Sequence, residues 1–329
     1  MSDTTTLPRR RPGGAIGLGD HTVARIGYGA MALEQYAGDL PAGERLLRRA
    51  IDLGVDHIDT ADFYGDSTAN AIIASAVRPA DGVVVVSKVG AVRDPGGPLP
   101  LRPAQRPAEL RTAVEDNLRS LRRDRIDIVN LRRLDVGPGI RAEGDQLIDL
   151  DDQLAALTAL RDEGLIGAIG LSAVGIGTLR RALPAGIACV QNAYGLVARQ
   201  FEDMLELCTA EGIAWVPFFP LGSRFAGMPK VTEQPEVVAA AARLGVTPSQ
   251  VGLAWLLRHA PNTLLIPGTG SAVHLAENVA VDEVVLDDAT TAELDGIWAA
   301  RFAAAGEAAP RWADRGAAVS RWAPAAARR

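Results

Sequence analysis

The chain has 329 residues, of which 48% are hydrophobic and 22% are charged. This balance is typical of a globular protein with a large buried core and excludes a disordered chain. No apolar run approaches the ~20 residues of a membrane-spanning helix, and the net charge of -6 argues against a nucleic-acid partner, which needs a concentrated basic face.

Short apolar runs alternate with amphipathic stretches along the chain. Apolar runs without polar alternation are typical of strands buried on both faces. The predicted strands are 26–31, 57–61, 83–88, 126–131, 166–172, 188–192, 214–219 and 264–267. The predicted helices are 43–53, 68–77, 107–121, 150–163, 175–183, 199–211 and 248–258. The last helix has a clear start signal, with Thr247 as cap, Pro248 in the first position and Gln250 completing a capping box.

Eight strands with intervening helices predict an α/β protein of the (β/α)8 TIM-barrel class. The alternative is an open doubly wound sheet, which would need a Gly-rich turn that leads directly into a helix. Gly27 and Gly29 provide half of such a pattern, but no helix start follows them. The barrel is therefore the favoured architecture.

The predicted organisation is one barrel domain over residues 14–302, with a flexible N-terminus (1–13) and a C-terminal tail (303–329). Residues 14–26 are typical of a β-hairpin, with two short strands around a turn at Gly19-Asp20, which could plug the barrel floor. The tail is either a frayed end or a flap whose tryptophans cover the barrel mouth. The segment 92–106 contains four prolines and is interpreted as a loop at the lip of the mouth.

Polar side chains stand where the predicted strands end, and barrel enzymes carry their chemistry at the C-terminal ends of their strands. Asp59 lies in the last part of the second strand and Tyr64 follows it, Lys88 ends the third, and Arg132 follows the fourth. A nearby ammonium stabilises a phenolate and so makes the phenol a better proton donor, while a carboxylate would keep that ammonium charged. The trio Asp59, Tyr64 and Lys88 therefore suits proton delivery to a carbonyl oxygen whose carbon receives a hydride.

Each of these residues also has a simpler interpretation. Asp59 could cap a helix and Tyr64 could be a surface loop residue. Lys88 could be a loop cation or the Schiff-base lysine of an aldolase.

Several segments, in this order, resemble the aldo-keto reductase family over roughly residues 14–300. They are Gly54-Val55-Asp56-His57-Ile58-Asp59-Thr60-Ala61-Asp62-Phe63-Tyr64, Val83–Lys88, Gly164–Ser172, Val190-Gln191-Asn192, Pro217–Gly222, Ile266–Ser271 and His274–Asn278. The resemblance implies a barrel that binds NADPH across its C-terminal face without a Rossmann domain. Tyr64 would be the general acid, Lys88 its tuning cation and Asp59 the partner of Lys88.

The same resemblance implies a set of cofactor contacts. Ser172 and Gln191 would contact the nicotinamide carboxamide, and Phe218 would stack on the nicotinamide ring. The other implied cofactor residues are Gly29, Ala30, Met31, Phe219, Leu221, Gly222, Gly268, Thr269, Ser271, His274, Glu277 and Asn278. The resemblance implies NADPH. Typical NADP-preferring relatives have Lys and Arg where this chain has Gly268 and His274, so NADH stays open as the alternative.

Arg132 departs from the family, because most members have His at that place. A guanidinium stays charged and donates in a planar fork, so it would favour a substrate with an anionic oxygen beside the reacting group. The alternative is that Arg132 turns away and pairs with Asp127 or Asp135. Two further departures are Ala173 and Ala193. Relatives usually have Asn in place of Ala173, so the resemblance implies the loss of one contact to the carboxamide, and an acidic residue is common in place of Ala193.

The segment Asn130-Leu131-Arg132 resembles a subgroup of the family, the bacterial pyridoxal reductases. The aldehyde of pyridoxal lies next to a phenolic oxygen that readily ionises, and Arg132 could bind that anion. The leading hypothesis is therefore NADPH-dependent reduction of pyridoxal to pyridoxine.

Other functions stay open. The substrate could be a different small aldehyde or ketone, such as a sugar or a secondary-metabolite intermediate. The protein could also be a redox-sensing subunit that binds nicotinamide with little turnover. Cys189 and Cys208 have no disulfide or metal-ligand spacing, so we expect no metal site and a reducing compartment, the cytoplasm. No membrane partner is expected, and the sequence makes no prediction of oligomeric state.

Overall fold

The computed structural model describes residues 10–137, 139–222 and 229–304, with side chains up to residue 300. Most of the predicted flexible N-terminus and the tail from residue 305 lie outside the described residues. The two alternatives for the tail, a frayed end or a flap over the barrel mouth, therefore concern a part of the chain that is not described.

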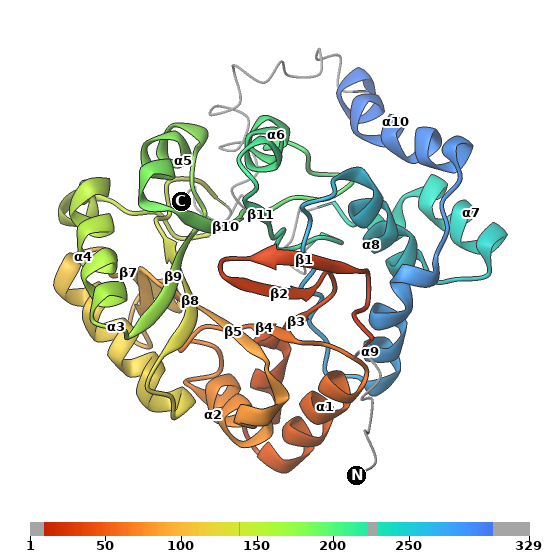
Figure 1. Ribbon diagram of the computed structural model, residues 1–329. Helices are drawn as coiled ribbons and strands as arrows, with labels where there is room; N and C mark the ends of the chain where they lie inside the picture. The colour runs from red at the N-terminus through yellow and green to blue at the C-terminus, as the bar shows by residue number, and fades with distance from the viewer. Residues whose placement is uncertain (1–9, 138, 223–228, 305–329) are drawn as a thin grey trace, which may run out of the picture.

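A parallel sheet forms the centre of the molecule (Figure 1). Seven strands pair in the order β11-β10-β9-β8-β5-β4-β3. Apart from β6 and β7, which form a separate sheet, each strand pairs with the strand that comes before or after it along the chain. Their bounds are β3 Tyr28–Gly29, β4 His57–Asp59, β5 Val84–Val89, β8 Ile126–Arg132, β9 Ile166–Ser172, β10 Ile187–Gln191 and β11 Ala214–Trp215.

The predicted eighth strand closes the barrel through two parallel bridges rather than a full ladder. Thr263 bridges to Trp215 of β11, and Leu265 bridges to Ile26 just before β3. The Gly27 amide also donates to the Leu265 carbonyl at 2.8 Å. These contacts join the two edges of the sheet, and the (β/α)8 barrel that the sequence predicts is confirmed.

Burial on both faces explains why the strands are apolar without alternation. In β5, Val84 and Val86 point into the barrel, where they pack with Ile128 and Leu264. Their neighbour Val85 points outward into the larger core between the strands and the helices.

The hairpin predicted at residues 14–26 is confirmed, with β1 (Ala15–Leu18) antiparallel to β2 (His21–Ala24). It lies across the centre of the barrel in Figure 1. Leu18 and Val23 pack into the interior cluster, so the hairpin covers one end of the barrel.

Helices form the outer ring in Figure 1. Those predicted from the sequence are α1 Leu40–Asp52, α2 Thr68–Ala76, α3 Pro107–Leu121, α4 Leu150–Asp162, α5 Ile176–Ala182, α6 Glu202–Ala210 and α8 Pro248–His259. The start of α8 is confirmed, because Thr247 and Gln250 form the reciprocal capping box. None of the described helices has the length and apolar character needed to cross a membrane.

Three α-helices and one hairpin of the described residues were not expected from the sequence. The helices are α7 (Pro235–Leu244), α9 (Ala272–Val279) and α10 (Asp288–Ala304). The hairpin lies in the proline-rich segment, which is not a plain loop: β6 (Ala91–Arg93) and β7 (Leu101–Pro103) form a short antiparallel pair there.

Candidate active site

The C-terminal ends of β4 and β5 bring Asp59 and Lys88 together. Their side chains form an ion pair, with only 4% and 7% of their respective surfaces exposed. The Lys88 ammonium also donates to the Thr60 carbonyl at 3.0 Å. A buried ion pair needs such further hydrogen bonds to offset the cost of removing both charges from water.

Tyr64 lies directly against this pair. The Lys88 Nζ is 5.2 Å from the centre of the Tyr64 ring. Burial lowers the pKa of Lys88, but the charge of Asp59, the neighbouring Tyr64 and hydrogen bonds to both outweigh it, so the pKa of Lys88 is raised. A lysine held charged in this way opposes the aldolase alternative, because Schiff-base formation needs a neutral amine.

Arg132 ends β8 and faces the same group of side chains. Its guanidinium lies 5.7 Å from the centre of the Phe63 ring, and that ring packs edge-on against Tyr64 at 5.2 Å. Burial lowers the pKa of Arg132, and the nearby Tyr64 opposes that shift.

Arg132 forms no ion pair with a carboxylate of the described residues. Asp127 and Asp135 were its candidate partners in the sequence, and both pair with another arginine. Asp127 pairs instead with Arg123 at 3.1 Å. Asp135 pairs with Arg133, also at 3.1 Å. Neither of these two carboxylates therefore engages the Arg132 guanidinium.

A buried polar network lies behind the loop that carries Tyr64. Asn70 of α2 accepts a hydrogen bond from Thr60, beside Asp59, and donates to Asn117 of α3 at 3.2 Å. Asn117 also accepts from Ser87, the neighbour of Lys88. The loop itself is fixed through Asp62, which accepts from Ser120 of α3 at 2.7 Å. The network thus joins the backbone segments of Asp59, Tyr64 and Lys88, and nothing in the sequence pattern marked it.

None of the described histidines takes the place of the expected family histidine. His57, on β4 beneath Asp59, is fully buried, and neither of its ring nitrogens has a hydrogen-bond partner in the described residues. Burial lowers the pKa of His57 to about 4, although Asp56 and Asp59 oppose that shift. His57 is therefore neutral and sealed beneath the site.

Gln191 at the end of β10 fits the amide of a nicotinamide ring. Its Nε2 donates to Asp59 Oδ2 at 2.6 Å. Its Oε1 is buried without a partner among the described residues. The Oε1 atom can accept a hydrogen bond beside the Asp59–Lys88 pair. The carboxamide N–H₂ group of a nicotinamide ring is a donor and needs such an acceptor.

The segment expected to surround the adenosine end is held by two tyrosines. Tyr28 donates to the Thr269 carbonyl at 2.6 Å, and Tyr36 donates to the Gly270 carbonyl at 2.7 Å. Ser271 then caps α9, whose residues include His274, Glu277 and Asn278. Gly268 passes so close to Gly29 that a Cβ there would lie 2.6 Å from the Gly29 carbonyl oxygen.

The remaining predicted cofactor residues also lie at or beyond the C-terminal ends of strands. Ser172 is buried at the end of β9, and Ala30 and Met31 open a 3-10 helix after β3. Phe218 bridges to Ala193 beyond β10, and its ring packs edge-on against Phe219 at 5.2 Å. Leu221 and Gly222 follow, just before the undescribed residues 223–228. All the predicted site residues therefore lie along one end of the barrel, and their roles remain predictions.

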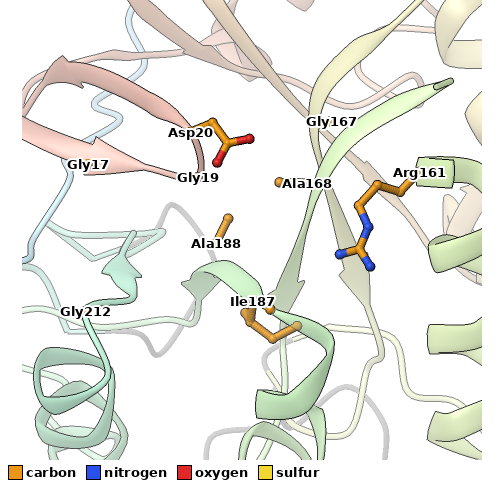
Figure 2. Close-up of a pocket in the computed structure, with 10 residues that line it drawn as sticks. Gly17, Gly19, Asp20, Arg161, Gly167, Ala168, Ile187, Ala188 and Gly212 are labelled. Carbon is orange, nitrogen blue, oxygen red and sulfur yellow. The ribbon is translucent and has the colours of Figure 1, made fainter.

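A different hollow lies at the opposite end of the barrel, beside the β1–β2 turn (Figure 2). This cavity of about 390 Å³ is lined by Gly17, Gly19, Asp20, Arg161, Gly167, Ala168, Gly186, Ile187, Ala188 and Gly212. None of the predicted site residues lines it, so it is not the candidate active site. In the described part of the chain, no group of three or more His, Cys, Asp and Glu side chains could hold a metal ion.

Comparison with known proteins places this geometry in a family. The family model described as "Aldo/keto reductase family" matches residues 25–299. The chain is 43% identical over 288 residues to the pyridoxine 4-dehydrogenase of Escherichia coli (strain K12), covering 85% of this chain and 96% of that protein. It is 33% identical over 290 residues to an uncharacterised oxidoreductase of Schizosaccharomyces pombe, covering 86% and 89%.

Solved structures of aldo-keto reductases are also similar to this chain. An aldo-keto reductase from Klebsiella pneumoniae in complex with NADPH has a TM-score of 0.71 and 28% identity, covering 86% of this chain and 94% of that chain. A structure of an aldo/keto reductase from the same organism with NADP and acetate has a TM-score of 0.71 and 27% identity, covering 86% and 95%. The chain belongs to the aldo/keto reductase family and is an NAD(P)H-dependent oxidoreductase.

Proposed function

We propose that the protein reduces an aromatic aldehyde that carries an ionised oxygen next to the aldehyde group, with pyridoxal as the substrate and pyridoxine as the product. The observation that carries this proposal is Arg132, a largely buried guanidinium beside Tyr64 with no carboxylate partner among the described residues. A buried cation without a partner is costly, and an anionic group of the substrate would offset that cost.

Four side chains divide the work in this proposal. Tyr64 donates a proton to the carbonyl oxygen, and Lys88 stabilises the phenolate that remains. Asp59 keeps Lys88 charged and oriented through their ion pair. Arg132 binds the neighbouring oxyanion and so fixes which way the aldehyde faces. The nicotinamide cofactor, when bound, supplies the hydride.

The similarity to a pyridoxine 4-dehydrogenase supports the substrate proposal. That relative is named for the reverse direction of the same interconversion, and it shares 43% of its residues with this chain over 96% of its own length. The reaction direction in the cell depends on the ratio of reduced to oxidised cofactor.

For the cofactor we propose NADPH, as in the related Klebsiella pneumoniae structure. Gln191 would accept the carboxamide N–H₂ through its free Oε1. The segment 268–271 and α9 would hold the adenosine end. A cytoplasmic location stays a prediction that two buried free cysteines support, because a reducing compartment keeps them as thiols.

The decisive variant is Arg132→His, which restores the residue expected from the family. We expect kcat/KM for pyridoxal to fall at least about tenfold, because an oxyanion held by a charge-assisted pair loses its partner. The kcat/KM for benzaldehyde, which has no oxyanion, should stay level or rise. Nicotinamide absorbance reports both rates, and a uniform loss on both aldehydes would contradict the proposed role of Arg132.

A further inference from the structure

Gln105 occupies the gap where strands β5 and β8 separate. The backbone pairing of the two strands ends at Val89 and Leu131, after which the chain turns away at Gly90, whose φ is +103°. The Gln105 Nε2 atom donates to the Gly90 carbonyl at 2.6 Å and to the Arg132 carbonyl at 2.8 Å. A side-chain amide thus continues the ladder where the backbone no longer does.

The fit in this gap is close. A Cβ on Gly90 would overlap the Arg132 carbonyl oxygen and would lie 2.9 Å from the Gln105 amide nitrogen. Gln105 is only 1% exposed, so its amide is removed from bulk water. Because carbonyl oxygens only accept, the amide has one possible orientation here.

Three further side chains hold Gln105 in this orientation. Gln153 of α4 donates to both the side-chain and the backbone oxygen of Gln105, each at 2.8 Å. Arg133 in turn donates to Gln153 Oε1 at 2.6 Å. The backbone N–H of Gln105 donates to Gln146 Oε1, also at 2.6 Å. The hydrogen bonds of Gln105 therefore link α4 and the segment after β7 to the ends of β5 and β8.

We propose that Gln105 is a positioning residue that sets substrate selectivity by fixing the spacing between Lys88 and Arg132. Lys88 lies on β5 two residues before Gly90, and Arg132 is the last residue of β8, so Gln105 joins the two strand ends just beyond them. This inference rests on the proposed function, in which the substrate contacts Tyr64 beside Lys88 with one oxygen and Arg132 with another.

A change in this spacing affects only substrates that make both contacts. A substrate whose oxyanion lies next to the aldehyde must span a fixed distance, and a misplacement on the order of 1 Å is costly to such a reaction. A substrate that lacks the neighbouring oxyanion touches only the Tyr64 side and is indifferent to where Arg132 lies. Gln105 should therefore act on selectivity more than on turnover in general.

The test compares salicylaldehyde, whose phenol is next to the aldehyde, with para-hydroxybenzaldehyde, whose phenol is across the ring. The measured quantity is the ratio of their kcat/KM values with NADPH. The variants are Gln105→Met, which keeps the length but removes the amide, and Arg132→Met. The matched control is Asn262→Leu, which removes a structural amide bonded to Ile213 and Thr209 at the other end of the barrel.

We expect the wild type to favour salicylaldehyde. Gln105→Met should lower the ratio of kcat/KM for salicylaldehyde to kcat/KM for para-hydroxybenzaldehyde about fivefold to tenfold. The turnover of para-hydroxybenzaldehyde should stay near the wild-type rate. Arg132→Met should lower the ratio at least as much, and Asn262→Leu should leave it unchanged. If Arg132→Met lowers the ratio but Gln105→Met lowers both rates equally or neither, the role of Gln105 is overturned while the proposed function stands.

If the wild type shows no selectivity between the two aldehydes, or if Arg132→Met leaves the wild-type selectivity unchanged, the proposed anion site itself is overturned. Melting temperature and NADPH binding by nicotinamide fluorescence show whether each variant is folded. If Gln105→Met does not fold, Gln153→Met carries the test: it removes the amide that orients Gln105 and should shift the ratio in the same direction, and an unchanged ratio would overturn the role of Gln105.

Discussion

Ala173, next to Ser172 at the end of β9, has an unusual backbone conformation. Its φ is +53°, in the left-handed region that Gly and Asn adopt far more readily than Ala. Its backbone N–H donates to the Gln191 carbonyl at 3.0 Å and its carbonyl accepts from the Asp135 N–H at 3.0 Å, so the surrounding loops impose the conformation. The local strain lies between two residues expected to contact the cofactor, and strained positions are frequent at functional sites.

Replacing Ala173 should therefore stabilise the fold. We expect Ala173→Gly to raise the free energy of unfolding by about 0.5 kcal/mol, the relief of the left-handed strain less the entropy that Gly adds to the unfolded chain. Ala173→Asn should also stabilise, and should in addition tighten NADPH binding if its amide reaches the carboxamide as the family resemblance implies. Denaturant unfolding and nicotinamide fluorescence measure the two effects. A lower unfolding midpoint for Ala173→Gly would show that the conformation carries no strain.

Single residues differ in how well the sequence reveals them. Asp59, Tyr64, Lys88 and Arg132 stood out as candidates because each lies near the C-terminal end of a predicted strand, and the structure brings them together. Gln105 gave no such signal, because it lies in a proline-rich segment whose path depends on contacts with residues far along the chain. Side-chain networks of this kind follow from tertiary packing and not from local pattern.

At the scale of elements, α2 and α3 support the loop between β4 and α2 through Asn70 and Asn117. The two amides are fully buried and hydrogen-bonded to each other at 3.2 Å. A fully satisfied buried network is rigid, whereas the loss of one member leaves its partners without hydrogen bonds.

Asn117→Ala should thus damage catalysis as well as stability. We expect kcat to fall about tenfold, because Tyr64 and Lys88 lose their common support. NADPH affinity should change little, since no predicted cofactor contact is touched. Stability should fall by about 1–3 kcal/mol for the unpaired buried groups. Asn262→Ala, which removes two side-chain hydrogen bonds far from the mouth, is the control. An equal fall in kcat for both variants would argue against a positioning role.

Whole elements were predictable where their signals are local. The capping box of α8 and the Gly19-Asp20 turn are fixed by neighbouring residues, and both are confirmed. The hairpin β6–β7 contains prolines that mask a strand pattern, and α7, α9 and α10 lie beyond the regular alternation of strand and helix. The eighth strand is reduced to two bridges, because its role is to close the barrel and the sequence alone cannot fix how many backbone bonds that closure uses.

At the scale of the whole molecule, one buried carboxylate ties several elements together. Glu202 of α6 accepts hydrogen bonds from Tyr194 at 2.7 Å and from Arg199 at 2.8 Å, and it pairs with His259 of α8. Arg199 also reaches Asp295 of α10 at 3.4 Å. Burial raises the pKa of Glu202, but the hydrogen bonds from His259 and Arg199 and the charges of both outweigh it and lower the pKa to about 2.

This shift predicts a pH dependence of stability with a definite sign. The folded-state pKa of Glu202 lies below its ordinary value of 4.5, so the unfolded chain binds more protons between about pH 4.5 and 2. The stabilisation is complete above that window and is lost as the pH falls through it. Thermal unfolding across this range should show a steeper loss for the wild type than for Glu202→Gln, whereas parallel curves would mean that Glu202 does not contribute.

The central claim is that Tyr64, which lies beside the Lys88–Asp59 pair, is the proton donor in carbonyl reduction. The most direct test is the steady-state rate of Tyr64→Phe with NADPH and pyridoxal, together with the NADPH dissociation constant. The ion pair and the cofactor residues are untouched by this change, so we expect NADPH binding close to wild type and a fall in kcat of at least about a hundredfold, as for the loss of a general acid. Near-normal turnover by Tyr64→Phe would contradict this account of the site.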